Sequence, residues 1–287
     1  MADTDELRKR VRSLIRVAPG AQRAFAEEIG LDETKLSKSL GGTRRFTAQE
    51  LVRVAEQSGV TVNWLLNGSD DAVTVTAVPA VSTRSSSAPD AEAQPEMRRR
   101  ILQTAWELIA TRGYHNVRIA DIAQACGTST GTIHYYFDTK DDVLNESLRR
   151  NVKLAFDRQV AELHTIDDAR ERLLRLVELQ LPTDGLLRDE WSVWLQVWNE
   201  VALTPGLRSL YWDSYDRWYR TVAMTIRLGQ EQGVFREQDP DDAAAQLTAL
   251  IDGLGIRVLC GTPGTSVSVM RRHLHDFIAH TVIKGSG

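Results

Sequence analysis

A stretch without any helical pattern, at residues 69–95, divides the chain. It is rich in Ser, Ala, Thr, Val, Asp and Pro, and its apolar residues follow no three- or four-residue spacing. The segments on either side do show that spacing, with breaks at Gly or Pro, as amphipathic helices do. The sequence therefore predicts an all-α protein with a flexible linker at 69–95 between separately folded parts. A short strand at residues 74–78, TVTAV, is the alternative for one part of that linker.

Composition limits the class of protein. The 287 residues are 42% hydrophobic and 26% charged, an ordinary globular balance. We find no apolar run long enough to span a membrane and no apolar stretch of a secretory signal near the start. Two cysteines, Cys126 and Cys260, are too few for a disulfide framework or a cysteine zinc site. These observations predict a cytoplasmic protein without a structural metal.

The net charge of −4 argues against a nucleic-acid partner until the charge is divided by segment. Residues 1–68 hold 11 basic and 9 acidic side chains, and residues 96–150 hold 8 and 7. The acidic excess lies in the linker and in the C-terminal half. Two helical segments thus carry a small basic surplus that permits contact with phosphates.

The first segment, residues 1–68, has the pattern of short helices joined by tight turns. Asp32 and Thr47 are suited to cap helices that follow them, and Gly30 suits the left-handed turn after a helix. This segment resembles the Cro/phage-repressor (XRE) helix-turn-helix domain through Gln22, Ala26, Gly30, Asp32, Leu36, Ser37, Lys38, Gly42, Thr47, Leu51, Ala55, Gly59, Val60 and the terminal WLLNG.

The resemblance to XRE domains implies a recognition helix at residues 33–40. Glu33, Thr34, Lys35 and Lys38 would face base edges. Phosphate or backbone contacts would come from Gln22, Arg44 and Arg45. The alternative is that these charges are simply solvated and that the domain binds a protein partner.

The second segment, residues 96–144, resembles the DNA-binding domain of TetR-family regulators. The matching residues are Ala105, Gly113, Tyr114, Val117, Ile119, Ile122, Ala123, Gly127, Gly131, Thr132, Ile133, Tyr135, Phe137, Lys140, Val143 and Leu144. The resemblance implies a recognition helix at 129–135, in which a glycine lets the backbone approach DNA. The implied DNA-binding residues are Arg118, Thr128, Ser129, Thr130, Gly131, Thr132, His134, Tyr135, Tyr136 and Lys140. Phe137 and Cys126 are expected in the core instead.

Residues 145–287 continue as helices, and six of them are what a TetR-type ligand-binding and dimerisation domain implies. Their arrangement is most similar to the BetI-type subgroup. The last two helices would pair with those of a second copy in a homodimer. His273, His275 and His280 lie in the last helix without the partners of a metal site, so no metal or cofactor is expected.

Aromatic residues gather in two neighbouring helices of this half, at helical spacing. The candidate ligand-binding residues are Trp191, Trp194, Trp198, Tyr211, Tyr215 and Trp218. Ordinary core packing is the alternative for each of them. Together they are suited to an apolar cavity for a flat aromatic or a cationic effector, with Glu200, Asp213 or Asp216 to attract a cation.

The combined reading is a homodimeric, ligand-responsive transcriptional regulator, a repressor released from palindromic double-stranded DNA by a small molecule. Ligand binding would tilt the helix that follows the TetR-type domain. The sequence holds no Gly-rich phosphate loop after a strand, no G-x-S-x-G and no H-E-x-x-H, so we do not expect an enzyme. The alternative keeps the TetR-type reader for DNA and gives the N-terminal helix-turn-helix to a protein partner.

Overall fold

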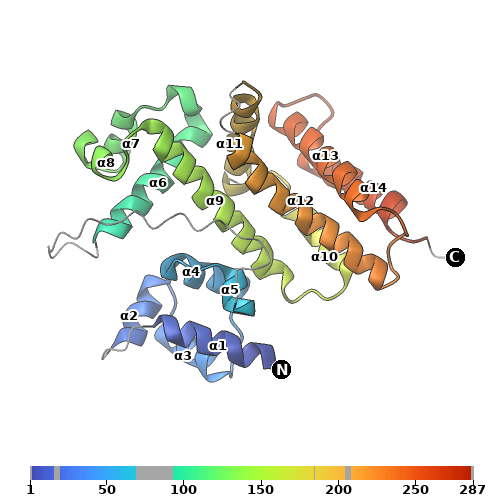
Figure 1. Cartoon of the computed structure of the whole chain (residues 1–287), viewed down its shortest axis with the longest axis horizontal. Coiled ribbons are helices and arrows are strands. Elements are labelled where there is room, and N and C mark those ends of the chain that lie inside the picture. The colour runs from blue at the N-terminus through green and yellow to red at the C-terminus, as the bar shows by residue number, and fades with distance from the viewer. Residues whose placement is uncertain (1, 16–19, 69–92, 184, 204–207, 286–287) are drawn as a thin grey trace. The chain divides into compact units, whose positions relative to one another are not determined.

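The computed structural model describes residues 2–15, 20–68, 93–183, 185–203 and 208–285. It is built of helices (Figure 1) and divides into two compact units. The N-terminal unit is Met1–Ser85 with Lys153–Thr165, and the main unit is Ser86–Val152 with Ile166–Gly287. Most of the predicted linker, including the TVTAV stretch, lies outside the described residues. Its last three residues belong to a helix that begins at Ala93.

The N-terminal unit contains five helices before the linker. They are α1 (Ala2–Leu14), α2 (Ala21–Glu28), α3 (Glu33–Gly41), α4 (Ala48–Ser58) and α5 (Val62–Asn67). The Asp32 carboxylate accepts hydrogen bonds from the N–H groups of Thr34 and Lys35, and Thr47 forms a reciprocal capping box with Glu50. Both predicted caps are confirmed because each side chain satisfies an N–H group that the helix itself leaves unpaired.

The core of the N-terminal unit draws on every one of these helices. Leu36, Leu51 and Leu65 are fully buried, and Val11 of α1 packs with them. The same cluster contains Ala161, which belongs to α9 (Lys140–Leu163). The second half of α9 therefore completes a unit that the sequence pattern assigned to residues 1–68 alone.

The main unit begins with α6 (Ala93–Arg112), a short 3-10 turn at Tyr114–Asn116, α7 (Ile119–Ala125) and α8 (Thr130–Tyr136). Gly127 adopts a φ of 63° in the turn between α7 and α8, a left-handed conformation that costs other residues energy. Ile101, Ile133 and Phe137 are buried in the core of this head, as is Cys126. We refer to residues 93–144 as the α8 head.

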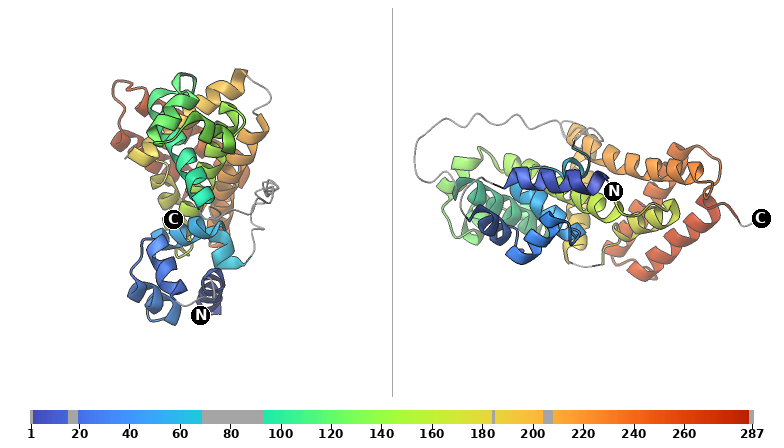
Figure 2. Two further views of the ribbon diagram at one scale, coloured as in Figure 1. Left: turned by 90° about the vertical axis from the view of Figure 1, so that its left-hand side faces the viewer. Right: turned by 90° about the horizontal axis from the view of Figure 1, so that it is seen from below.

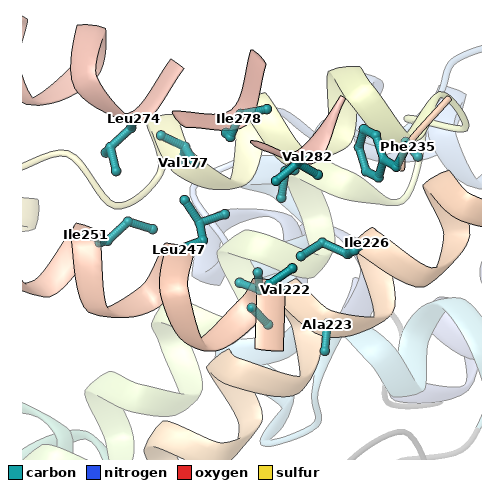
Figure 3. Close-up of a cluster of buried hydrophobic side chains, with 14 of the residues drawn as sticks. Val177, Val222, Ala223, Ile226, Phe235, Leu247, Ile251, Leu274, Ile278 and Val282 are labelled. Carbon is teal, nitrogen blue, oxygen red and sulfur yellow. The ribbon is translucent and has the colours of Figure 1, made fainter. Parts of the chain in front are cut away.

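The rest of the main unit is α10 (Ala169–Glu178), α11 (Gly185–Leu203), α12 (Arg208–Glu231), α13 (Pro240–Leu259) and α14 (Val267–Phe277), which passes into a π-helical turn at Ile278–Val282. Figures 1 and 2 show α12 and α13 packed side by side. Their apolar faces meet α10 and α14 in one core (Figure 3), where Val222, Leu247 and Leu274 are fully buried. The α8 head and these helices belong to one compact unit, and the domain boundary expected at residues 144 and 145 stays a prediction.

Among the described residues there is one isolated antiparallel β-bridge. It pairs Phe235, which follows α12, with Ile283, which follows the π-helical turn. Phe235 packs directly over Gly229, where an added Cβ would lie 2.0 Å from the ring. Gly229 therefore has no room for a side chain. Within the described ranges, no helix is both long enough and apolar enough to span a membrane.

Candidate functional site

Helix α8 presents polar and aromatic side chains on one exposed face. Ser129 caps the helix by accepting a hydrogen bond from the N–H of Thr132. Thr130, Gly131, His134 and Tyr135 are exposed, while Ile133 points into the core. Tyr135 leaves 67% of its surface accessible, which is unusual for so large an aromatic residue. The predicted recognition residues therefore lie together on an accessible surface.

Gly131 is not required by packing inside the α8 head. A Cβ built at this position would meet only the Ser129 Oγ, at 3.6 Å, which is an ordinary contact. Its φ is not positive either, so its backbone needs no glycine. A demand for glycine here would have to come from a partner that approaches the exposed face of α8.

The flanking candidates have mixed exposure. Arg118 is exposed beside the first turn of α7, and Thr128, Thr132 and Tyr136 are half-buried. The Lys140 ammonium lies 4.2 Å from the centre of the Tyr114 ring, and burial lowers the pKa of Lys140. Lys140 is thus held by a cation–π contact rather than extended into solvent.

Helix α3 of the N-terminal unit also has an exposed polar face. Glu33, Thr34, Lys35 and Lys38 are all exposed, and so is Arg45 in the loop after the helix. Gln22 is half-buried. The residues expected to face base edges therefore share an accessible helix surface.

Arg44 is held inside the N-terminal unit. Its guanidinium donates to both carboxylate oxygens of Glu50, at 2.9 and 2.6 Å, and to the Ser39 Oγ at 2.8 Å. Burial acts to raise the pKa of Glu50, but the bonds from Arg44 and from the Thr47 N–H hold that pKa below its ordinary value. This pair fixes the loop between α3 and α4, so a phosphate contact by Arg44 would compete with an internal role.

Helix α11 is bonded to the α8 head along one face. Ser192 Oγ donates to the carbonyl of Ala110 at 2.7 Å. Gln196 accepts from the N–H of Tyr114 at 2.7 Å and donates to the carbonyl of Ile109 at 3.1 Å. The Glu200 carboxylate lies 2.7 Å from His115 Nε2. We call Ser192, Gln196 and Glu200, which follow each other at four-residue intervals, the α11 seam.

A cavity of about 510 Å³ lies next to the α11 seam within the main unit. Its wall includes Tyr114, Lys140, Gln196, Glu200 and Tyr211, so it joins the α8 head to α11 and α12. A volume of this size is typical of small-molecule sites.

Trp191 lies in the core of the main unit. Its ring edge fills a notch at Gly255 of α13, where a Cβ would fall 2.1 Å away. Its indole N–H donates to the Gln180 carbonyl at 2.8 Å, and its ring meets Trp198 edge to face at 6.1 Å. Trp198 and Trp218 pack partly buried against the same core. The packing of Trp191, Trp198 and Trp218 favours a role in the hydrophobic core over a role in lining a ligand cavity.

Trp194, Tyr211 and Tyr215 form a different aromatic group. The Trp194 and Tyr211 rings meet edge to face at 6.3 Å, and Tyr211 stacks on Tyr215 at 5.4 Å. The Tyr215 hydroxyl donates to the Asp252 carboxylate at 2.8 Å. We call Trp194, Tyr211, Tyr215 and Asp252 the aromatic cluster. Burial raises the pKa of Asp252 to about 6, and the hydrogen bond from Tyr215 opposes that rise.

Sequence reasoning missed Asp252 as the carboxylate of this group. Of the acids it named, Glu200 pairs with His115, Asp216 forms an ion pair with Arg220 at 2.8 Å, and the side chain of Asp213 is outside the described part. One signal was present: Asp252 is a lone acid inside the apolar second half of α13. The sequence of α13 gave no sign that Asp252 would face Tyr215 of α12.

Two family profiles match the main unit. "Bacterial regulatory proteins, tetR family" matches residues 101–146, and "BetI-type transcriptional repressor, C-terminal" matches residues 169–282. The regulator BetI of Klebsiella pneumoniae (strain 342) is 30% identical over 175 residues, which is 59% of this chain and 86% of that protein. BetI of Cronobacter sakazakii is 31% identical over 175 residues, 59% of this chain and 83% of that protein.

A solved structure of a putative transcriptional regulator from Saccharomonospora viridis, in complex with choline, is 71% identical. The match covers 67% of this chain and all of that one, with a TM-score of 0.65. The chain belongs to the TetR family. It is a transcriptional regulator with a TetR-type DNA-binding domain and a BetI-type C-terminal domain. The exposed face of α8 lies inside the matched DNA-binding domain, and the aromatic cluster lies inside the matched C-terminal one.

Helices α1–α5 fall before both matched ranges of the TetR-family profiles. Their XRE-type character therefore remains a prediction from sequence.

Near the end of the chain, in α14, His275 lies 3.4 Å from Glu178, whose carboxylate is also bonded by Arg271. Among the described residues, no group of three or more potential ligands gathers at a metal-binding geometry.

Proposed function

We propose that this TetR-family protein is a repressor that leaves its operator when a small quaternary ammonium cation, such as choline, binds the main unit. The observation that carries the proposal is the aromatic cluster, in which Tyr215 is hydrogen-bonded to the half-buried Asp252 carboxylate and stacks on Tyr211, which in turn meets Trp194. Its relevance is strengthened by the 71% identical regulator, whose structure holds choline.

The chemistry of the aromatic cluster suits a cation without hydrogen-bond donors. Aromatic ring faces attract quaternary ammonium groups through their quadrupoles, and a nearby carboxylate adds a full opposite charge. Within the described part of the chain, the Asp252 carboxylate accepts a hydrogen bond from Tyr215 and forms no ion pair with a basic side chain. A bound cation would therefore stabilise the ionised form of Asp252. An uncharged flat aromatic ligand, the second candidate, would leave that charge without compensation.

The route from effector to DNA would run along α11. Trp194 belongs to the aromatic cluster, while Gln196, two residues later, is bonded to the backbone of the α8 head. A ligand shifts the equilibrium between two states only by its difference in affinity for them. If the cation prefers a turned or displaced α11, the α11 seam carries that preference to the α8 head.

Palindromic DNA requires two α8 heads, so we also propose a homodimer. In such a dimer the recognition helices enter successive major grooves about 34–36 Å apart. The supporting argument is the BetI-type domain, whose last two helices, α13 and α14 here, are expected to pair with those of a second copy. A size measurement in solution tests this part.

The N-terminal unit is proposed to be a second DNA reader of XRE type. Its exposed α3 face with Lys35 and Lys38 supports this role, because these ammonium groups are suited to phosphate oxygens. The alternative, a protein partner for the same face, predicts no salt-dependent contribution to DNA affinity.

Choline titration of the full chain, followed by tryptophan fluorescence, tests the effector. We expect saturable binding, weakened tenfold or more by Asp252→Asn, and choline-dependent release of DNA. Asp216→Asn is the matched control, because it removes an equivalent charge on an exposed side chain already paired with Arg220. Absence of saturable choline binding, or equal effects of the two substitutions, would overturn the assignment.

A further inference from the structure

The short helix α5 is held at both ends by charged side chains from other helices. At its C-terminal end, Arg10 of α1 donates to the carbonyls of Leu65 and Leu66, at 2.8 and 2.6 Å. At its N-terminal end, the N–H of Val62 donates to Asp157 Oδ1 at 2.8 Å. Asp157 belongs to α9, far from α5 in the sequence. A helix of six residues has little stability of its own, so these end contacts hold it in place.

Asp157 is fully buried, with no accessible surface, and it is paired. Its second carboxylate oxygen accepts from Lys153 Nζ at 2.6 Å, and the same ammonium donates to the Val60 carbonyl at 2.7 Å. Lys153 and Asp157 thus bond the backbone on both sides of the turn that leads into α5. A buried carboxylate is costly unless its hydrogen bonds are made, which makes this arrangement specific for one docking position.

Apolar contact continues along the same face of α9. Ala161 is buried in the core of the N-terminal unit, and Val160 packs against that core. Lys153, Asp157 and Ala161 follow at four-residue intervals, so they occupy one stripe of the helix. The exposed face of α3 takes no part in these contacts between α5 and α9, and it stays available for another partner.

We propose that the N-terminal helix-turn-helix is not a freely tethered reader but a domain docked on α9, through which it senses the effector state of the main unit. The second part rests on the function proposed above. Helix α9 runs without Gly or Pro from Lys140, which lines the cavity of the main unit, to Leu163. Any movement of α9 that the effector favours therefore reaches the bonds that Lys153 and Asp157 make with the backbone of Val60 and Val62.

Hydrogen–deuterium exchange of the full chain tests the docking. We expect Asp157→Ala to speed exchange of the Val62 amide and of α5 about tenfold or more, since a buried bond to a charged group is lost. Asp157→Asn keeps an acceptor oxygen and should have a smaller effect. Asp167→Asn, at an exposed acid outside the N-terminal unit, is the control and should leave α5 unchanged.

Arg10→Ala separates docking from the stability of α5 itself. It should loosen α5 from its other end while α9 stays protected, whereas Asp157→Ala should raise exchange in both α5 and the second half of α9. Equal exchange of α5 in Asp157→Ala and the parent chain would overturn the docking. Protection of α5 that falls on dilution would place the α9 of a second copy there and overturn the docking within one chain.

Choline is the probe for the coupling. In the parent chain, saturating choline should change α5 exchange at least threefold, and Asp157→Ala should abolish that change while choline still binds. If fluorescence shows saturation and α5 exchange stays constant, the coupling is overturned although the effector assignment stands. If choline does not bind, the proposed effector fails instead, while the mutant exchange rates still decide the docking.

Discussion

The α8 head and the N-terminal bundle, by which we mean helices α1–α5, use the same local design. They differ in the helix to which each is bonded. Each presents a short helix after a capping residue, Ser129 before α8 and Asp32 before α3, with an exposed polar face. The α8 head is bonded through backbone groups to α11, the helix that also carries Trp194. The N-terminal bundle is bonded to α9 through the Lys153 and Asp157 pair.

Under the proposed function, this difference would separate reading DNA from responding to a ligand. Contact with DNA needs an exposed helix face, whereas a response to a ligand also needs energetic coupling between the ligand site and that face. For the α8 head the proposed path is short, because Gln196 lies two residues after Trp194 on α11. For the N-terminal bundle it passes through the length of α9.

The largest effect is expected on α8 itself. Replacing Thr130 and Tyr135 together with Ala should lower specific DNA affinity about a hundredfold, because base-edge and groove contacts are worth roughly 1–3 kcal/mol each. Binding should be measured by fluorescence anisotropy with DNA selected from random sequence by the parent chain. Met224→Ala, an exposed apolar residue of α12, is the control. Full affinity in the double variant would remove α8 from the DNA interface.

A tenfold effect is expected from pH at the aromatic cluster. Above a pKa of about 6 Asp252 is a carboxylate that attracts a cation, and below it the group becomes neutral. Choline should therefore bind about tenfold more weakly at pH 5 than at pH 7.5, with proton release on binding near pH 6. Asp252→Asn should bind weakly and without this slope. A parent chain whose affinity stays flat over that range would exclude Asp252 as the charge partner.

The α11 seam should show an effect of about fivefold. Gln196→Ala removes the bonds to Tyr114 and Ile109, so choline should still bind but release DNA less completely, by about 1 kcal/mol of coupling. Comparing DNA affinity with and without saturating choline measures this. Leu186→Ala, exposed on the same helix, should behave like the parent. Unchanged release in Gln196→Ala would move the path away from α11.

The smallest effect is expected at α3. Lys35→Ala or Lys38→Ala should each weaken DNA binding about threefold and make it less dependent on salt, as loss of one phosphate contact per subunit does. Lys9→Ala removes the same charge from α1, where Lys9 pairs with Glu6, and serves as the control. Identical salt slopes for all three variants and the parent would favour the protein-partner alternative.

Local signals predicted the helices and their caps well. Asp32, Thr47 and Gly127 act through their own backbone neighbourhood, so their roles can be read from nearby residues. The resemblance to TetR-family DNA-binding domains implied the exposed face of α8, and the burial of Ile133 agrees with it. Binding roles of the named DNA contacts remain predictions.

Contacts between distant helices were not predictable in this way. Asp252 and Tyr215 meet only after α12 and α13 pack together, and no spacing within either helix indicates that pairing. Asp157 is buried against α5, and nothing in the spacing along α9 sets it apart from the other acids of that helix. The linker pattern suggested that residues 1–68 fold alone, whereas the structure adds part of α9 to their core.

The close packing of Trp191 against Gly255 makes this tryptophan an internal reference for fluorescence measurements. Trp191 is shielded from water, so its emission should lie at short wavelength and resist quenching by acrylamide. Trp212 on α12 is 58% exposed and should emit further to the red and be quenched readily. A ligand that enters beside Trp194 would alter part of the spectrum while the Trp191 contribution stays constant. The intensity ratio at two wavelengths can then report occupancy without any attached dye.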